Sequence, residues 1–207
     1  MPQSPPAGAL SLDELRLAVE EALSTLPIPE TPASLYDPVR YILESGGKRL
    51  RPVLLLLTAQ AFGARLETAM PAALAGEVFH NFTLVHDDIM DHADTRRGRT
   101  TVHVKWDEPT AILSGDYMMA LSYELISALP PEPSPRVFTQ YHRMVRQLCE
   151  GQALDKAFAT RSDVTLSDYF AMIEGKTGAL IQAVFEIGGL VGFADEAQQA
   201  TLSQLGK

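Results

Sequence analysis

Apolar residues recur at every third or fourth position along almost the whole chain, and proline or glycine interrupts the pattern at intervals. Leu15, Val19 and Leu23 show it first, and Ser11 and Glu14 just before them have the S-x-x-E form of a helix capping box. This period suits helices that bury one face, whereas half-buried strands need apolar and polar residues to alternate. No sustained alternation and no Asn-Gly or Asp-Gly hairpin turn occurs, so the sequence predicts an all-α fold.

Prolines and glycines divide the pattern into segments that we expect to be separate helices. These cover about residues 11–26, 35–45, 52–63, 69–91, 110–129, 166–174 and 176–193, with a long helix from about 136 and another starting at the end. A polar loop is expected at 94–101 and a Pro-rich loop at 130–135. We expect residues 1–10 to be a flexible tail and residues 11–207 to form one helical domain.

Composition excludes several classes of protein. The 207 residues include 26 acidic and 17 basic side chains, and the net charge of −9 argues against a nucleic-acid-binding protein. The single cysteine, Cys149, excludes a disulfide framework, and we expect it to be a buried structural thiol. No segment has the order of a signal peptide or the length of a membrane span, so the sequence predicts a cytoplasmic protein.

The most informative segment is the DDxxD pattern at residues 87–91, inside an apolar helical stretch. Asp87 and Asp91 share a helix face, where two like charges destabilise the helix, and His80 falls near the same face. A hard divalent cation would offset the repulsion, and magnesium takes one or two protein carboxylates together with water and substrate phosphate. A solvated acidic helix end is the structural alternative.

Two basic clusters flank this segment in an otherwise acidic chain. Residues 46–52, Gly-Gly-Lys-Arg-Leu-Arg-Pro, place three cations in a glycine-started turn, and residues 94–99 place three more just after the carboxylates. Glycine turns and helix N-termini offer N–H groups to phosphate, and arginine can bind two phosphate oxygens at once. Beside a candidate magnesium site the clusters indicate a diphosphate substrate; solvated surface charge is the alternative.

These segments and two later ones resemble, in order, the motifs of the trans-type isoprenyl diphosphate synthases. The matching residues are 46–52, 84–91, Arg96-Arg97-Gly98, Gly151-Gln152-Ala153-Leu154-Asp155 and 175–180, Gly-Lys-Thr-Gly-Ala-Leu. The resemblance begins at Tyr36 and implies an isoprenoid synthase helical bundle around a central apolar cavity. It also implies a Mg2+-dependent prenyltransferase that condenses isopentenyl diphosphate with an allylic diphosphate.

The resemblance carries the family's roles onto the matching residues. Isopentenyl diphosphate would be bound by Lys48, Arg51, His80 and Arg97, and magnesium by Asp87, Asp88 and Asp91. The allylic diphosphate would contact Arg96, Lys176 and Thr177, with Gln152 and Asp155 lining the cavity nearby; an ordinary polar pair is the alternative for these last two. Catalysis is expected to depend on Asp87, Asp91, Arg96 and Lys176, which would stabilise the departing pyrophosphate directly or through magnesium.

Product length is expected to depend on the residues below the carboxylates. Phe82 lies five residues before Asp87, about one and a half turns deeper at roughly 1.5 Å per residue, and Thr83 beside it is small. In the family a bulky side chain near this position forms the floor of the tail pocket, and core packing is the alternative. No two-residue insertion separates Asp88 from Asp91, unlike in the bacterial farnesyl type, so the pattern resembles a geranylgeranyl-type synthase.

The family's second aspartate-rich motif does not occur in the sequence, which ends at Lys207 where the helix leading to it would begin. We therefore expect a fragment that lacks the C-terminal helices of a longer enzyme, or a non-catalytic partner subunit. The resemblance also implies a homodimer.

Two other enzyme classes are possible interpretations of the same residues. A class I terpene cyclase uses a DDxxD magnesium site but has no use for Lys48, Arg51 and Arg97. An HD-type phosphohydrolase would use His86 and Asp87 as metal ligands, but it needs further histidine ligands and leaves the basic clusters unexplained.

Overall fold

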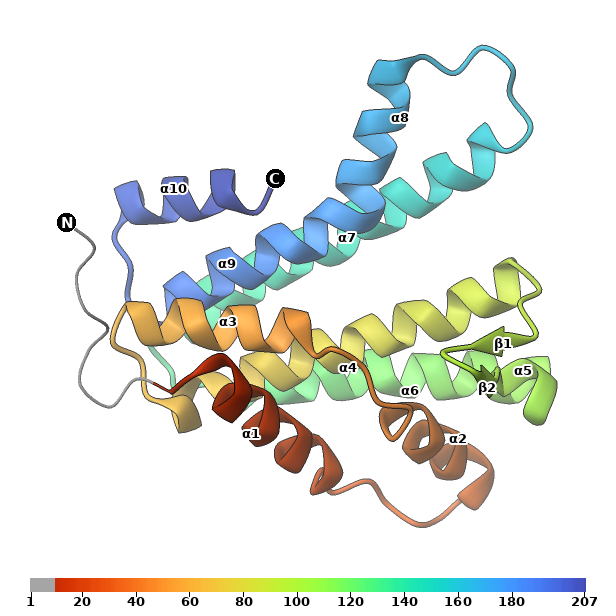
Figure 1. The fold of residues 1–207 in the computed structure, drawn as a ribbon, viewed down its shortest axis with the longest axis horizontal. Coiled ribbons are helices and arrows are strands. Elements are labelled where there is room, and N and C mark those ends of the chain that lie inside the picture. Colours follow the sequence, from red (N-terminus) through yellow and green to blue (C-terminus); the bar gives the residue numbers. More distant parts are fainter. Residues whose placement is uncertain (1–9) are drawn as a thin grey trace. The chain divides into compact units, whose positions relative to one another are not determined.

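The computed structural model describes residues 10–207, which form helices, one short strand pair and connecting loops (Figure 1). The helices are α1 (Leu12–Ser24), α2 (Ala33–Leu43), α3 (Leu50–Ala61), α4 (Leu66–Met90), α5 (Val102–Lys105), α6 (Glu108–Ser127), α7 (Ser134–Phe158), α8 (Leu166–Ile173), α9 (Ala179–Val191) and α10 (Glu196–Leu205). The predicted all-α class is confirmed. The predicted tail lies outside the described residues except for Leu10, whose amide donates to the side chain of Gln60 at 2.9 Å.

Local sequence signals set several helix ends. Ser11 and Glu14 form the predicted capping box of α1: the Ser11 hydroxyl accepts from the Glu14 amide at 3.4 Å, and the Glu14 carboxylate accepts from the Ser11 amide at 2.8 Å. The same motif begins α8 and α10. Each box satisfies amides that have no partner inside the helix.

The described residues form two compact units, each with its own core. The N-terminal unit comprises Ser11–Val53 and Ala73–Ala128, and its fully buried side chains are Leu15, Val19, Val39, Val78, Phe79, Met118 and Ile126 among others. The C-terminal unit comprises Leu54–Ala72, Leu129–Lys207 and Leu10, with a core that includes Leu55, Leu56, Val137, Tyr141, Met144 and Val191. In the first unit α2 and α5 pack on α6; in the second α7 lies along α9, and α9 packs on α10 (Figure 1).

The polar loop that the sequence predicts at residues 94–101 contains a short strand pair. Strand β1 (Thr95–Arg96) pairs antiparallel with β2 (Arg99–Thr100) across a two-residue turn, and α5 follows directly. The turn residues Arg97 and Gly98 have φ angles of 53° and 75°, and a tight hairpin turn with positive φ at both positions allows the strands to pair. Arginine stands where asparagine or aspartate is usual, so the common sequence signal was absent.

The prediction of two separate helices at residues 166–174 and 176–193 is wrong. A π-helical turn, η1 (Glu174–Gly178), joins α8 to α9 without a break. Gly175 does not end a helix; it lies against α7, where an added Cβ would be 2.9 Å from the Cα of Gly151. The glycine therefore serves a close approach of two backbones.

Two further expectations can be compared with the structure. The prediction that Cys149 is a buried thiol is wrong, because its side chain is exposed on α7. Across residues 10–207, none of the helices is long and apolar enough to cross a membrane.

Candidate functional site

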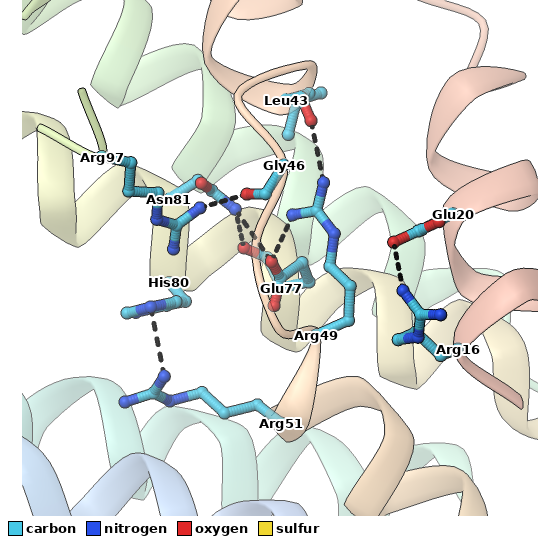
Figure 2. A network of polar contacts seen from close by, with 10 residues as sticks. All are labelled: Arg16, Glu20, Leu43, Gly46, Arg49, Arg51, Glu77, His80, Asn81 and Arg97. Carbon is cyan, nitrogen blue, oxygen red and sulfur yellow. Dashed lines mark hydrogen bonds and ion pairs between the residues drawn. The ribbon is translucent and has the colours of Figure 1, made fainter. Parts of the chain in front are cut away.

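The three cations of the turn before α3, Lys48, Arg49 and Arg51, differ in their exposure and partners. Both glycines and Arg49 have positive φ angles, of 71°, 148° and 49° in chain order. Lys48 is exposed, Arg49 is buried, and Arg51 points its Nη1 atom at Nε2 of His80, 3.1 Å away (Figure 2). The predicted basic cluster therefore leaves Lys48 and Arg51 accessible to a ligand and places its third cation inside the protein.

His80 lies among arginines and is neutral. Burial, followed by the charges of Arg51, Arg97, Arg96 and Arg49, lowers the pKa of His80 to about 3. Because a guanidinium group only donates hydrogen bonds, Nε2 of His80 accepts from Arg51 and the ring proton is on Nδ1. Burial also lowers the pKa of Arg51. A partly buried excess of positive charge of this kind favours the binding of an anion.

Replacing His80 with glutamine is expected to make stability less dependent on pH. The folded-state pKa of His80, about 3, is below its ordinary value of 6.5, so the unfolded chain binds the proton more readily between these values. The contribution of neutral His80 to the free energy of unfolding is fully present above pH 6.5 and is lost as the pH falls toward 3. Near pH 5 this one proton contributes a slope of about 1 kcal/mol per pH unit, which His80→Gln removes. Urea unfolding of both proteins between pH 7 and 5 measures the difference; equal slopes would show that His80 titrates normally in the folded state.

Arg97, in the hairpin turn, lies against the glycine turn. Its Nη1 donates a hydrogen bond to the carbonyl oxygen of Gly46, and a Cβ at Gly47 would lie 2.9 Å from that same nitrogen. Glycine at position 47 therefore permits the approach. Since Arg51 and Arg97 both lower the pKa of His80, the N-terminal unit brings these three sequence-predicted residues together.

Asp87 and Asp91 lie one helical turn apart at the end of α4. The amide of Asp91 donates to the carbonyl oxygen of Asp87 at 2.9 Å, so the helical spacing continues through the motif. Asp91 is exposed, and the Asp87 side chain is 24% exposed. Two oxygen donors at this spacing are on the same side of the helix, as the sequence predicts.

Asp88 points into the protein. Its side chain is 7% exposed, and its Oδ1 accepts a hydrogen bond from Nε of Arg96 at 2.6 Å. Burial raises the pKa of Asp88, and the bond to Arg96 opposes that change. Another nitrogen of Arg96 lies 3.8 Å from Oδ2 of Asp87. Arg96 and Asp88 also line one small pocket of the N-terminal unit together with Arg97 and Tyr41.

The donor chemistry of Asp87 and Asp91 fits magnesium. Residues 10–207 contain no group of three or more Asp, Glu, His or Cys side chains placed to hold a metal by themselves. Mg2+, however, characteristically binds one or two carboxylates and completes its shell with water and substrate phosphate. The two carboxylates of Asp87 and Asp91, with Arg96 3.8 Å from Asp87, meet that requirement.

The other predicted site residues belong to the C-terminal unit. Gln152 and Asp155 lie on α7, and Nζ of Lys176 in η1 is 2.6 Å from Oδ2 of Asp155. Thr177 follows Lys176 and is exposed. The structure therefore pairs a predicted cavity-lining carboxylate directly with a predicted phosphate-binding lysine.

Phe82 and Thr83, the predicted chain-length residues, are half-buried on α4. The Phe82 ring packs on the rings of Phe79 and His86, with centroids 5.2 and 4.8 Å apart. The Thr83 hydroxyl donates to the carbonyl oxygen of His80 at 2.8 Å. Gly115 on α6 makes room for His86, because a Cβ there would lie 2.3 Å from Nε2 of His86.

Sequence reasoning missed two groups of supporting residues. Glu77 on α4 binds Arg49, and Asn81 on the same helix binds Glu77. The signal for Glu77 was its position as the lone acidic residue in the apolar stretch before His80. Tyr41 on α2 holds the hairpin: its ring lies 3.9 Å from the Arg99 guanidinium and its hydroxyl donates to the carbonyl oxygen of Thr100 at 2.9 Å. Nothing in the sequence indicated that second contact.

Comparison with known proteins shows the family of this chain. Residues 32–207 match the family model described as polyprenyl synthetase. The geranylgeranyl diphosphate synthase of Methanosarcina mazei is 44% identical over 191 residues, which cover 91% of this chain and 59% of that protein. The geranylfarnesyl diphosphate synthase of Natronomonas pharaonis is 41% identical over 210 residues, which cover 92% and 61%.

A solved structure gives the same result for the fold. The geranylgeranyl pyrophosphate synthetase of the archaeon Geoglobus acetivorans superimposes with a TM-score of 0.90 at 41% identity, over 94% of this chain and 64% of that one. The chain spans about three fifths of the length of the curated relatives it matches. The ordered motifs, the helical architecture and the family match over residues 32–207 agree, and the chain belongs to the polyprenyl synthetase family of trans-type isoprenyl diphosphate synthases.

Proposed function

We propose that the chain is a prenyltransferase that condenses isopentenyl diphosphate with an allylic diphosphate to a trans-prenyl diphosphate of geranylgeranyl or farnesyl length. The observation that carries this proposal is the grouping of Arg51 and Arg97 around a neutral His80, in the unit that also presents Asp87 and Asp91. A class I terpene cyclase, which does not bind isopentenyl diphosphate, would have no use for the grouping of Arg51, Arg97 and His80. The relatives named as geranylgeranyl and geranylfarnesyl diphosphate synthases support a product in this range.

Lys48, Arg51, His80 and Arg97 would bind the diphosphate of isopentenyl diphosphate. Arg51 and Arg97 offer charge-assisted hydrogen bonds, which are about twice as strong as neutral ones. The neutral His80 holds Arg51 in place by accepting its hydrogen bond. Lys48 extends from the same glycine turn as Arg51 and adds an exposed cation.

Asp87 and Asp91, with Asp88 behind them, would hold Mg2+ beside the allylic diphosphate. The chemistry that Mg2+ supplies when bound is Lewis-acid stabilisation of the charge on the leaving pyrophosphate. Arg96, Lys176 and Thr177 would contact the same diphosphate, and Gln152 and Asp155 would line the cavity near it. Arg96 must then share its guanidinium between Asp88 and the substrate, since its Nε is bonded to Asp88.

The reaction needs no nucleophilic side chain. The carbon–oxygen bond of the allylic diphosphate breaks, the double bond of isopentenyl diphosphate forms the new carbon–carbon bond, and a proton leaves to the released pyrophosphate. The cationic side chains stabilise the charge that develops on the leaving group. We further propose that the protein works in the cytoplasm, where its charged substrates dissolve, and that it acts as a homodimer; exposed Ile112, Leu113 and Met119 on α6 support the second point.

The test is incubation of the chain with Mg2+, isopentenyl diphosphate and an allylic diphosphate. Condensed prenyl diphosphates are expected; a hydrocarbon made without isopentenyl diphosphate would indicate a cyclase, and binding without turnover would indicate a partner subunit. Arg51→Gln is expected to weaken isopentenyl diphosphate binding by about 10- to 100-fold, because charged hydrogen bonds contribute about 1.5–3 kcal/mol. Calorimetry measures this, with Arg16→Gln at an exposed ion pair as the control. Unchanged affinity in Arg51→Gln would contradict the assignment.

Phe82 would set product length as the floor of the tail pocket, with Thr83 leaving space beside it. Replacing Phe82 with alanine removes a ring that packs on Phe79 and His86. The expected result is a shift to products at least one five-carbon unit longer, measured by mass spectrometry of the dephosphorylated alcohols. A Thr83→Ser variant keeps the small hydroxyl and serves as the control. An unchanged product distribution in Phe82→Ala would remove the floor role.

A further inference from the structure

We propose that Glu77 is a positioning residue for the isopentenyl diphosphate site: through a buried ion pair with Arg49 it fixes the turn at residues 46–51. This inference rests on the proposed function of Lys48, Arg51 and Arg97. It assigns a role to Arg49, the cation of the basic cluster at residues 46–52 that does not belong to the proposed diphosphate site.

The ion pair is short and enclosed. Nη1 of Arg49 lies 2.7 Å from Oε1 of Glu77, and the two side chains are 5% and 4% exposed (Figure 2). Nη2 of Arg49 donates to the carbonyl oxygen of Leu43 at 3.1 Å, which connects the turn to the end of α2. Nδ2 of Asn81 donates to the Glu77 carbonyl oxygen at 2.8 Å and lies 3.4 Å from its Oε1. Asn81 therefore holds Glu77, and Glu77 in turn holds Arg49.

The backbone of the turn requires such an anchor. Gly46, Gly47 and Arg49 all have positive φ angles, and a positive φ is uncommon for a residue with a Cβ. A conformation of this kind persists where the surrounding contacts determine it. The contacts that do so at Arg49 are the bonds to Glu77 and Leu43.

Two ligand-facing cations depend on where the turn lies. Arg51 follows Arg49 by two residues, and its Nη1 lies 3.1 Å from Nε2 of His80. Arg97 donates to the carbonyl oxygen of Gly46, which precedes Arg49 by three residues. In Figure 2 His80 and the guanidinium groups of Arg51 and Arg97 lie on the left, whereas Arg49 lies to their right with its guanidinium group between Glu77 and the carbonyl oxygen of Leu43. A displacement of Arg49 would therefore move the supports of both cations.

The buried pair is better explained by position than by stability. Taking two charges out of water is costly, and apolar replacement of a whole buried ion pair is often neutral or stabilising. Removing one partner, in contrast, leaves an uncompensated charge. The role of the pair can consequently be separated from the stability of the fold by replacing both residues at once.

The experiment compares the Arg49→Met/Glu77→Leu double variant with wild type by thermal unfolding and by calorimetric titration with isopentenyl diphosphate. The expected result is a melting temperature within a few degrees of wild type and at least 10-fold weaker binding. Binding of Mn2+ as a magnesium substitute is expected to stay within twofold, because Asp87 and Asp91 follow Glu77 by 10 and 14 residues along α4 and just beyond it, about 15–21 Å at 1.5 Å per residue. Glu20→Gln breaks an exposed Arg–Glu pair, 44% and 40% exposed, and is expected to change neither binding nor melting.

The outcomes separate this proposal from the proposed function. Wild type that binds no isopentenyl diphosphate would overturn the function of the site and the proposal with it. Wild type that binds, beside a folded double variant of equal affinity, would overturn the positioning role alone. If the double variant does not fold, Arg49→Lys keeps the charge next to Glu77 but loses the second bond to Leu43. It is expected to stay folded and to bind several-fold more weakly, and wild-type affinity there would overturn the proposal.

Discussion

The Asp87→Asn/Asp91→Asn double variant is expected to lose Mg2+-dependent binding of an allylic diphosphate by about 100-fold or more. A bound metal ion contributes several kcal/mol to charge stabilisation at such a site, and about 1.4 kcal/mol corresponds to a factor of ten. Calorimetry with a non-reactive allylic thiodiphosphate, with Mg2+ and with EDTA, measures the effect. Isopentenyl diphosphate binding is expected to stay within twofold, because the pair formed by Arg51 and His80 does not involve these carboxylates.

Unfolding does not explain such a loss. Two like charges four residues apart destabilise a helix by a few tenths of a kcal/mol, so their removal leaves α4 at least as stable. Asp88→Asn is the matched control, since its Oδ1 lies 2.6 Å from Nε of Arg96 inside the protein. It is expected to lower stability by about 1–3 kcal/mol while affecting Mg2+ binding less than the double variant does. Equal losses of Mg2+ binding in both proteins would contradict this division between the three carboxylates.

Gly151→Ala is expected to destabilise the C-terminal unit by about 2–3 kcal/mol and to separate Lys176 from Asp155. A Cβ at position 151 would lie 2.1 Å from the amide nitrogen of Lys176 and 2.5 Å from the carbonyl carbon of Gly175. Because these are backbone atoms that cannot rotate away, α7 and η1 must move apart. Overpacking of this kind typically costs about 1–3 kcal/mol. Thermal unfolding should show a lower midpoint by roughly 4–10 °C.

Gly178→Ala provides the control for this change within the same segment. Its added Cβ would have no neighbour closer than 3.8 Å, and its φ of −66° is ordinary for a helix. Alanine is favoured over glycine in helices, so stability is expected to rise by up to about 1 kcal/mol. A Gly151→Ala protein that melts at the wild-type temperature would show that the two backbones can separate without cost.

Much of the site was predictable because it depends on spacing along one helix. Asp87 and Asp91 share a side of α4 through the 3.6-residue period alone, and the capping box of Ser11 and Glu14 needs only three residues of separation. The order of the motifs along the chain also indicates the family, and the match over residues 32–207 confirms it. Local period and motif order are properties of the linear chain.

Contacts between distant residues could not be predicted in this way. Arg49 is one of three cations in a short basic run, and only the fold pairs it with Glu77, 28 residues later. Gly151 and Gly175 looked like a motif residue and a helix break, whereas their backbones meet. Cys149 seemed a core residue and is exposed.

The sequence by itself determined the helical class, the family and the residue types that would meet magnesium and diphosphate. Only the tertiary structure decided which neighbours those side chains have: Arg51 and Arg97 lie beside His80, while Arg49 and Asp88 turn inward to partners of opposite charge. The physical reason is that periodicity places a side chain on a helix face. Whether that side chain is exposed or buried, and what neutralises its charge, depends on the other segments that pack against it.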